Sequence, residues 1–266
     1  MAGKPALSWI NWVDFPGVTF EASNELLALP ASNLADEDAN QVWGVSGLTA
    51  GSTSFYVDID LLEECEIDVF ALILGWRLDR PEKLRQTPLM AATDKIQIFV
   101  DDGVTAFGTG GEYNSTLLDC EIDPALGYCV IIPPSTVTGQ RIRLFVNPVS
   151  RDTAPEDFWW GGRFWAGPMK TMLRHHQFGH TEKWAENKFE ETIRSPSIPL
   201  QRIKESEIDD MKTFEQLTVT KRQFLFIRDT DDPNKTSTLG KRTDTSGYQS
   251  LFFQNYGTTL QQQETW

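Results

Sequence analysis

The sequence is short of positive charge. Its 266 residues include 24 lysine and arginine residues against 38 aspartate and glutamate residues, which gives a formal net charge of −14. Proteins that bind nucleic acid need clustered lysine and arginine side chains to displace the counterions of the phosphate backbone. The charge balance therefore argues against sequence-specific nucleic-acid binding, although it suits a surface past which DNA slides without sticking.

Long hydrophobic runs are missing too. The longest, Val69 to Leu74, is far shorter than the roughly 20 apolar residues that a membrane-spanning helix needs. The first five residues, Met1 to Pro5, contain neither the apolar core nor the small-residue cleavage site of a signal peptide. We expect no membrane span and no export by the ordinary secretory route.

Cysteine is scarce. Cys65, Cys120 and Cys129 form no CxxC pair and no cluster with histidine, so the sequence predicts no zinc site. Three cysteines cannot all pair within one chain. We expect three small buried residues in a protein made in a reducing cytoplasm, and a Cys120–Cys129 bridge across a hairpin is the alternative if the protein is oxidised.

Catalytic signatures are also absent. The sequence contains no GxSxG stretch, no Walker loop and no dinucleotide-binding fingerprint. Its acidic clusters at residues 36–38 and 63–66 lack the apolar surroundings that would separate a general acid from a general base, and both are interpreted as solvated loops. We expect a protein that is not an enzyme and binds no cofactor.

Two segments resemble metal sites only superficially. His175, His176 and His180 include two imidazoles four residues apart, but a glycine intervenes and no glutamate follows His176, so the metalloprotease pattern fails. The segment 229–240 starts like a calcium loop but has proline, asparagine and glycine at its fifth, sixth and twelfth positions. We expect a solvated histidine segment and a turn capped by Asp and Asn, with other calcium geometries as the alternative for the turn.

What the sequence does contain is a series of short strand-like runs divided by turn residues. Residues 54–61, 95–100 and 141–149 alternate between apolar and polar, which is typical of strands with one buried face. Residues 67–74 and 127–132 are continuously apolar, which is typical of strands buried on both faces. The inward positions of the alternating runs are Phe55, Val57, Ile59, Leu61, Ile96, Ile98, Val100, Ile142, Leu144 and Val146. This spacing predicts a β-sandwich.

The composition and the hydrophobic pattern of the sequence change beyond about residue 167. Residues 169–196 are polar, and the only convincing helix follows them, with Ser206 as its N-cap and apolar residues three apart from Ile208 to Leu217. Further strands are predicted at 221–228 and near the C-terminus. The chain is therefore predicted to be mainly β, with a β-sandwich at 1–168 and a smaller α+β domain at 169–266 that combines a sheet or barrel with one helix. Length alone also allows one large sandwich.

An aromatic segment near the domain boundary has two interpretations. Trp159, Trp160 and Trp165 could stack on sugar rings at the edge of the sandwich, or they could fill the core or a subunit interface. Burial in the core or an interface is the preferred interpretation. The polar segment 76–94, with Arg77 and Arg80, is predicted to be an exposed loop that contacts a neighbour. These five side chains are our candidates for an interface or glycan contact.

Three stretches in the first domain, and further residues in the second, resemble a known family. Leu29 to Asp36, continuing to Gln41-Val42-Trp43, is similar to the opening of phage proteins with a discoidin-like (galactose-binding-like) domain. Phe55 to Leu61 resembles the next strand of that fold, and Gly162 to Pro168 is similar to its closing strand. Residues 224–233, followed by Gly240-Lys241-Arg242 and a last strand ending in glutamate, resemble the second domain of the same phage proteins.

The resemblance implies a structural protein of a phage tail tip or distal tail. It implies a location in the virion after synthesis in the host cytoplasm, other tail proteins as partners, and assembly into a homo-oligomeric ring. We hypothesise that the C-terminal domain makes the ring and that the discoidin-like domain lies on its outside. Ring contacts would bury open β edges, and aromatic patches would anchor them. The alternative is a carbohydrate-binding module that contacts host surface glycan. A tail-associated glycan hydrolase is a third hypothesis, for which the sequence offers no residue.

Overall fold

A computed structural model of the chain shows two compact units, which are residues 11–168 and residues 1–10 together with 169–266. The residues that the structure describes are 3–37, 41–46, 54–73, 95–104, 107, 112–115, 118–119, 128–147, 159–172, 181–186, 192–218, 222–242, 249–252 and 255–264.

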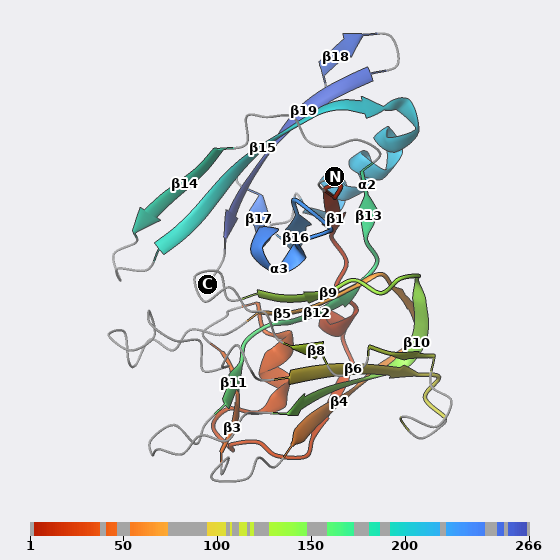
Figure 1. Ribbon diagram of the computed structural model, residues 1–266, viewed down its shortest axis with the longest axis vertical. Coiled ribbons are helices and arrows are strands. Elements are labelled where there is room, and N and C mark those ends of the chain that lie inside the picture. Colours follow the sequence, from red (N-terminus) through yellow and green to blue (C-terminus); the bar gives the residue numbers. More distant parts are fainter. Residues whose placement is uncertain are drawn as a thin grey trace. The chain divides into compact units, whose positions relative to one another are not determined.

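The first unit contains a large antiparallel sheet (Figure 1). Its strands follow the order β2-β4-β10-β6-β7, and β8 pairs with β6 beside β7. The strands are β2 (Thr19–Ala22), β4 (Phe55–Ile67), β10 (Val137–Asn147), β6 (Lys95–Asp101), β7 (Tyr113–Asn114) and β8 (Leu118–Asp119). Strand β10 thus lies between two strands that precede it in the chain, and it pairs along most of its length with β4 and β6.

A smaller sheet packs against the large one. Its order is β12-β5-β9, made by β12 (Phe164–Gly167), β5 (Val69–Ile73) and β9 (Tyr128–Ile131). A separate pair joins β3 (Trp43–Val45) to β11 (Trp159–Gly161), and two short 3-10 helices, η1 (Trp12–Asp14) and η2 (Ala31–Ala35), complete the described elements of this unit. One buried cluster takes side chains from both sheets, so this unit is a β-sandwich.

The alternation in the sequence explains which side chains fill the sandwich. All ten predicted inward residues of β4, β6 and β10 are buried, and β5 and β9 are buried along their full length, as strands covered on both faces should be. Trp43 packs edge-on against Phe55 with ring centroids 5.6 Å apart. The predicted β-sandwich is confirmed.

A buried arginine links the closing strand to the 3-10 helices. Arg163 is 1% exposed; its Nη2 contacts Asp14 Oδ2 at 2.5 Å and its Nη1 donates to the carbonyl of Ala35 at 2.5 Å. Asn11 donates to the other oxygen of Asp14 at 2.7 Å. Burial raises the pKa of the Asp14 carboxyl, because the loss of hydration outweighs the attraction of Arg163. The pair is structural, since it ties η1 and η2 to the start of β12.

The second unit is built on an eight-stranded sheet. Its path is β13-β1-β16-β17-β19-β15-β14, with β18 paired to β19. The strands are β1 (Ala6–Ser8), β13 (Lys170–Thr171), β14 (Thr181–Glu186), β15 (Thr192–Lys204), β16 (Gln223–Ile227), β17 (Ser237–Arg242), β18 (Gln249–Phe252) and β19 (Asn255–Glu264). The predicted helix is confirmed as α2 (Ile208–Thr218), which follows η3 (Glu205–Glu207) and packs Met211 and Phe214 against Phe224 and Phe226 of β16.

Three features differ from the sequence prediction. Residues 1–10 were assigned to the sandwich, but β1 pairs with β13 and β16 and therefore belongs to the second unit. The polar residues 181–186 and 192–204 form the paired strands β14 and β15. The expected acidic loop at 63–66 is part of β4, although its glutamates are exposed. In addition, the turn at 229–234 leads into a short helix, α3 (Pro233–Thr236). None of the helices in the described segments is long and apolar enough to cross a membrane.

Candidate binding face of the sandwich

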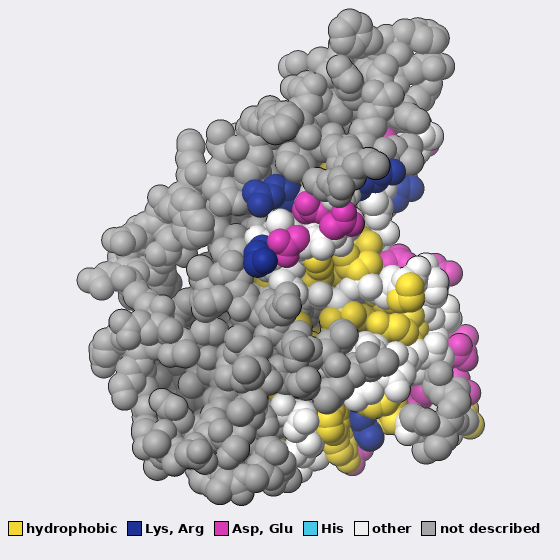
Figure 2. All heavy atoms as spheres, in the orientation of Figure 1, with side chains coloured by type: hydrophobic (Ala, Val, Ile, Leu, Met, Phe, Trp, Pro, Cys, Tyr) yellow, Lys and Arg dark blue, Asp and Glu magenta, His cyan; other side chains and the backbone are white. Residues whose placement is uncertain are grey.

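The outer face of the large sheet carries the most developed polar arrangement in the described part of the chain. Along β4, β6 and β10 these side chains alternate with the core residues, so they point away from the sandwich interior. We call this surface the polar face. Its members are Glu21, Tyr56, Asp58, Asp60, Phe99, Asp101, Phe107, Arg141, Arg143 and Phe145. Figure 2 shows hydrophobic, basic and acidic side chains close together at the lower end of the described surface in that view.

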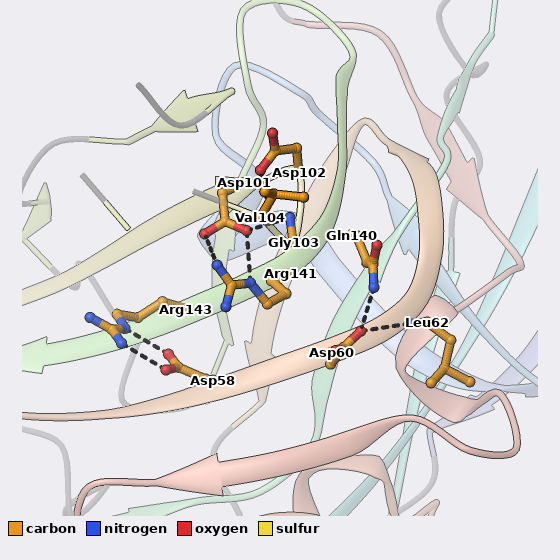
Figure 3. A network of polar contacts seen from close by, with 10 residues as sticks. All are labelled: Asp58, Asp60, Leu62, Asp101, Asp102, Gly103, Val104, Gln140, Arg141 and Arg143. Carbon is orange, nitrogen blue, oxygen red and sulfur yellow. Dashed lines mark hydrogen bonds and ion pairs between the residues drawn. The ribbon is translucent and has the colours of Figure 1, made fainter. Parts of the chain in front are cut away.

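The first ion pair of the polar face joins β10 to β6. Arg141 lies opposite Asp101 in the register, and its Nε and Nη2 contact the two carboxylate oxygens at 2.9 and 3.0 Å (Figure 3). The Asp101 side chain is 0% exposed, whereas that of Arg141 is 29% exposed. Asp101 also accepts the backbone N–H of Gly103 at 2.8 Å. The aspartate therefore closes the hairpin turn that the sequence predicted and fixes the guanidinium at the same time.

The second ion pair joins β10 to β4. Arg143 lies opposite Asp58, with Nε and Nη2 at 2.6 and 2.7 Å from its oxygens. The guanidinium carbon lies 3.9 Å from the ring centroid of Tyr56 and 4.4 Å from that of Phe107. Its Nη1 makes no hydrogen bond to the described residues and points away from Asp58 (Figure 3). Arg143 is thus fixed on three sides and keeps one donor group for another molecule.

Hydrogen bonds continue from the turn to a bulge in β4. Gln140 contacts the turn, because a side chain on Gly103 (φ +82°) would lie 2.8 Å from its Oε1. Gln140 donates to Asp60 Oδ1 at 3.1 Å, and the backbone N–H of Leu62 donates to the same oxygen at 2.8 Å. The register between β10 and β4 shifts at this point, and Leu62 adopts a left-handed conformation with φ of 73°. The polar side chains therefore hold the bulge in place.

The carboxylates set the electrostatics of the polar face. The pKa of Arg141 is raised, mainly by its hydrogen bonds to Asp101, and the negative charges of Asp58 and Asp60 add to the effect. The pKa of Arg143 is raised, mainly by its hydrogen bonds to Asp58. Both guanidiniums therefore lie in a field that favours positive charge.

None of the candidate residues named from the sequence is among the described members of the polar face. Trp165 is in β12 and is 1% exposed, so its side chain is buried rather than presented to a ligand. The backbones of Trp159 and Trp160 lie in β11 opposite Val45 and Gly44, and their side chains are outside the description. Arg77 and Arg80 lie outside the described residues.

Of the two segments that resembled metal sites, the structure describes only the acidic turn. His175, His176 and His180 lie outside the described residues. In the acidic turn, Asp229 accepts the backbone N–H of Asp231 at 3.0 Å, which is the capping that the sequence predicted. No group of three or more histidine, cysteine, aspartate or glutamate side chains in the described segments could hold a metal ion.

Only part of the polar face could be predicted from the sequence. Alternation placed Arg141 and Arg143 on the outer side of their strand. It could not reveal that β10 lies between β4 and β6, which is what brings each arginine to its aspartate.

Known proteins are similar to this chain in structure and not in sequence. No protein-family model matches the chain, and no curated protein is similar to it in sequence. Among solved structures, the family 32 carbohydrate-binding module of Clostridium perfringens NanJ in complex with galactose matches 62% of this chain and 99% of its own, with 11% identity and a TM-score of 0.41. A second C. perfringens module, in complex with GalNAc-β-1,3-galactose, matches 60% of this chain and 100% of its own, with 12% identity and a TM-score of 0.41. A fragment of a putative chitobiase from Bacteroides thetaiotaomicron matches 62% and 94%, with 13% identity and a TM-score of 0.42.

Proposed function

We propose that this chain is a non-catalytic binding protein and that its sandwich unit holds a saccharide on the polar face. The observation that carries the proposal is Arg143, which is fixed between Tyr56 and Phe107 and bonded to Asp58, while its Nη1 makes no hydrogen bond to any described residue. A donor held in this way loses little conformational entropy when a ligand arrives.

The side chains around Arg143 suit the chemistry of sugars. A sugar ring offers C–H groups on its faces, which pack on aromatic side chains, and hydroxyl groups at its edges, which need fixed donors and acceptors. The half-buried rings of Tyr56, Phe99 and Phe145 share the polar face with the two arginines. The register brings Tyr56 and Phe145 directly opposite each other on β4 and β10.

The same contacts speak against catalysis at this face. A glycoside hydrolase needs one carboxyl group that keeps a proton at working pH and a second that stays ionised. Asp58 and Asp101 each accept two hydrogen bonds from a guanidinium, so both oxygens of each carboxylate are already engaged and neither residue is placed to give a proton to a substrate. This supports a binding role without turnover.

Titration with neutral oligosaccharides tests the proposal. We expect chemical-shift changes on β4, β6 and β10 in NMR spectra, and we expect Arg143→Lys to weaken binding about tenfold, because lysine cannot replace the planar, bidentate guanidinium. The control is Lys170→Arg, the reverse exchange at the surface pair with Asp210 in the other unit, and it should bind like the wild type. If no neutral oligosaccharide binds at millimolar concentration, the proposal is wrong.

The resemblance to phage structural proteins supports a second proposal, that the protein is a subunit of a tail-tip ring in the virion. The terminal strands of the eight-stranded sheet, β13 and β14, each pair on one side only among the described strands. Open strand edges of this kind can pair with a neighbouring subunit. Negative-stain microscopy of the purified protein with tail fractions should show a discrete ring, whereas a monomer that is absent from purified particles would refute the assembly role.

A further inference from the structure

Large hydrophobic side chains are exposed where a turn of the sandwich unit meets the bulge of β4. Phe15 is 47% exposed and Leu62 is 54% exposed. The turn brings them together, because the backbone N–H of Val18 donates to the carbonyl of Phe15 at 3.2 Å and a side chain on Gly17 (φ +98°) would lie 2.8 Å from Leu62 Cδ1. Proline precedes this glycine, as in a type II turn, so the backbone here is well defined.

Trp12 extends this surface, and its contacts hold it in place. Its ring centroid lies 5.3 Å from that of Phe15, and its Nε1 donates to the carbonyl of Glu66 at 2.8 Å. Asp60 accepts the backbone N–H of Leu62, whose side chain points away from the two ion pairs of the polar face (Figure 3). We call this surface the apolar patch. Its members are Trp12, Phe15, Pro16 and Leu62. It is fixed before a partner arrives, which lowers the entropy cost of binding.

Negative charge borders the apolar patch. Glu63, Glu64 and Glu66 follow Leu62 in β4, and all three are exposed. None of them is paired with a lysine or arginine of the described segments. An anionic membrane surface would be repelled by these carboxylates. The matching partner is a basic protein segment with apolar side chains between its charges.

The chain itself contains a segment of this chemistry. In residues 76–86, basic side chains outnumber acidic ones by four to two, whereas the whole chain has a net charge of −14. The basic residues are Arg77, Arg80, Lys83 and Arg85, and the apolar residues between and beside them are Trp76, Leu78 and Leu84. The segment lies outside the described residues, within the stretch that the sequence predicts to contact a neighbour.

We infer that the apolar patch of one copy of this chain binds the basic segment 76–86 of a second copy. The apolar side chains of the segment cover Phe15 and Leu62, and its lysine and arginine side chains pair with the glutamates that border the patch. The contact joins two different surfaces, so it is heterologous and either extends or closes into a ring. It does not depend on saccharide binding.

The sheet register favours a second copy over the same chain. The stretch that contains the basic segment leads into β6 at Lys95, which lies opposite Asn147. Asp60, beside the apolar patch, lies opposite Arg141. The two positions are six residues apart along β10, which corresponds to about 20 Å. The segment therefore joins the sheet at the end remote from the patch of its own chain.

Sedimentation velocity of the full chain tests the inference. At about 50 mM salt we expect the sedimentation coefficient to rise as the protein concentration rises from about 1 to about 200 µM, and at about 0.5 M salt we expect a much smaller rise, because salt screens exposed charges. Association driven only by apolar contact would show the opposite trend, since salt also screens the repulsion between two acidic proteins.

Charge reversal identifies the two surfaces. Glu63→Lys with Glu64→Lys reverses the border of the patch, and Arg80→Glu with Lys83→Glu reverses the segment. Each double variant alone should associate at least about tenfold more weakly than the wild type, because like charges then face each other. An equimolar mixture of the two should associate like the wild type, because every contact between the two variants joins opposite charges.

Matched variants control for net charge and for exposure. Asp209→Lys with Asp231→Lys changes two exposed carboxylates of the other unit in the same way and should not weaken association. Phe15→Ser should weaken association roughly fivefold through lost apolar contact. Leu27→Ser removes a side chain that is 99% exposed in the same unit and should change nothing. Unchanged urea midpoints show that each variant is folded.

The outcomes are distinct. If the wild type stays monomeric over the whole concentration range, or if the mixture of reversed variants does not recover association, the inference is wrong. That result would leave the tail-ring proposal standing if tail fractions still show a ring, because a ring can also form through the edges at β13 and β14.

Discussion

Burial should decide how much each ion pair of the polar face contributes to stability. The two pairs have the same bidentate geometry, but Asp101 is 0% exposed whereas Asp58 is 22% exposed. Asp101→Asn replaces one accepting oxygen by an N–H group that faces a donor, and hydrogen bonds to a charged group are worth about 1.5–3 kcal/mol. Because Arg141 is partly hydrated, we expect a loss of about 2 kcal/mol. Asp58→Asn should cost less, about 0.5 kcal/mol, because both side chains of that pair are partly exposed to water.

Urea unfolding of the full chain measures both losses, provided that the dependence of the unfolding free energy on denaturant stays unchanged. Double-mutant cycles with Arg141→Gln and Arg143→Gln then isolate the coupling within each pair. The reasoning predicts that the coupling of Asp101 with Arg141 exceeds that of Asp58 with Arg143 by about threefold. Equal coupling energies, or a larger value for the exposed pair, would refute it.

Three further changes probe the sandwich. Gly139→Ala should destabilise it by about 1–3 kcal/mol in urea unfolding, because the new methyl group would collide with the side chain of Val100, and an unchanged midpoint would contradict this. Burial raises the pKa of Asp14 above its ordinary value of 3.8, so the folded protein binds this proton more tightly than the unfolded chain does. The stability of the wild type relative to Asp14→Asn should therefore fall as pH rises from about 4 through the folded pKa, whereas a rise would mean that the attraction of Arg163 dominates. Burial also raises the pKa of the Cys65 thiol, so iodoacetamide should label Cys65 slowly at neutral pH until denaturant is added, as peptide mass spectrometry can check.

The sandwich strands could be predicted because their local pattern and their burial agree. In β4, β6 and β10 every second residue is apolar and enters the core, so the period alone identifies strand and face. The turn at Asp101 was predictable for a similar reason, since an aspartate side chain can bond its own backbone two residues on.

Other features depend on contacts distant in sequence. β15 contains Pro196 and Pro199, which normally count against a strand, yet it pairs with β14 and β19 over 13 residues. The strand partners of β10 follow from the order of the sheet, which alternation does not contain. The left-handed conformation of Leu62 could not be predicted either, because Asp60, which accepts the backbone N–H of Leu62, is itself bonded by Gln140 from a distant part of the chain.

The route of the chain through its two units has a consequence for synthesis. The chain opens with β1, passes through the whole sandwich, and returns at β13 to complete the sheet that β1 belongs to. The sandwich is in effect inserted into its host domain, and all of its residues leave the ribosome before the last strands of that domain are made. We therefore expect the sandwich to fold first during synthesis, while β1 remains unpaired until β16 has been made. An N-terminal tag or a deletion of β1 would then impair the domain that folds last, although most residues of that domain lie at the C-terminal end of the sequence.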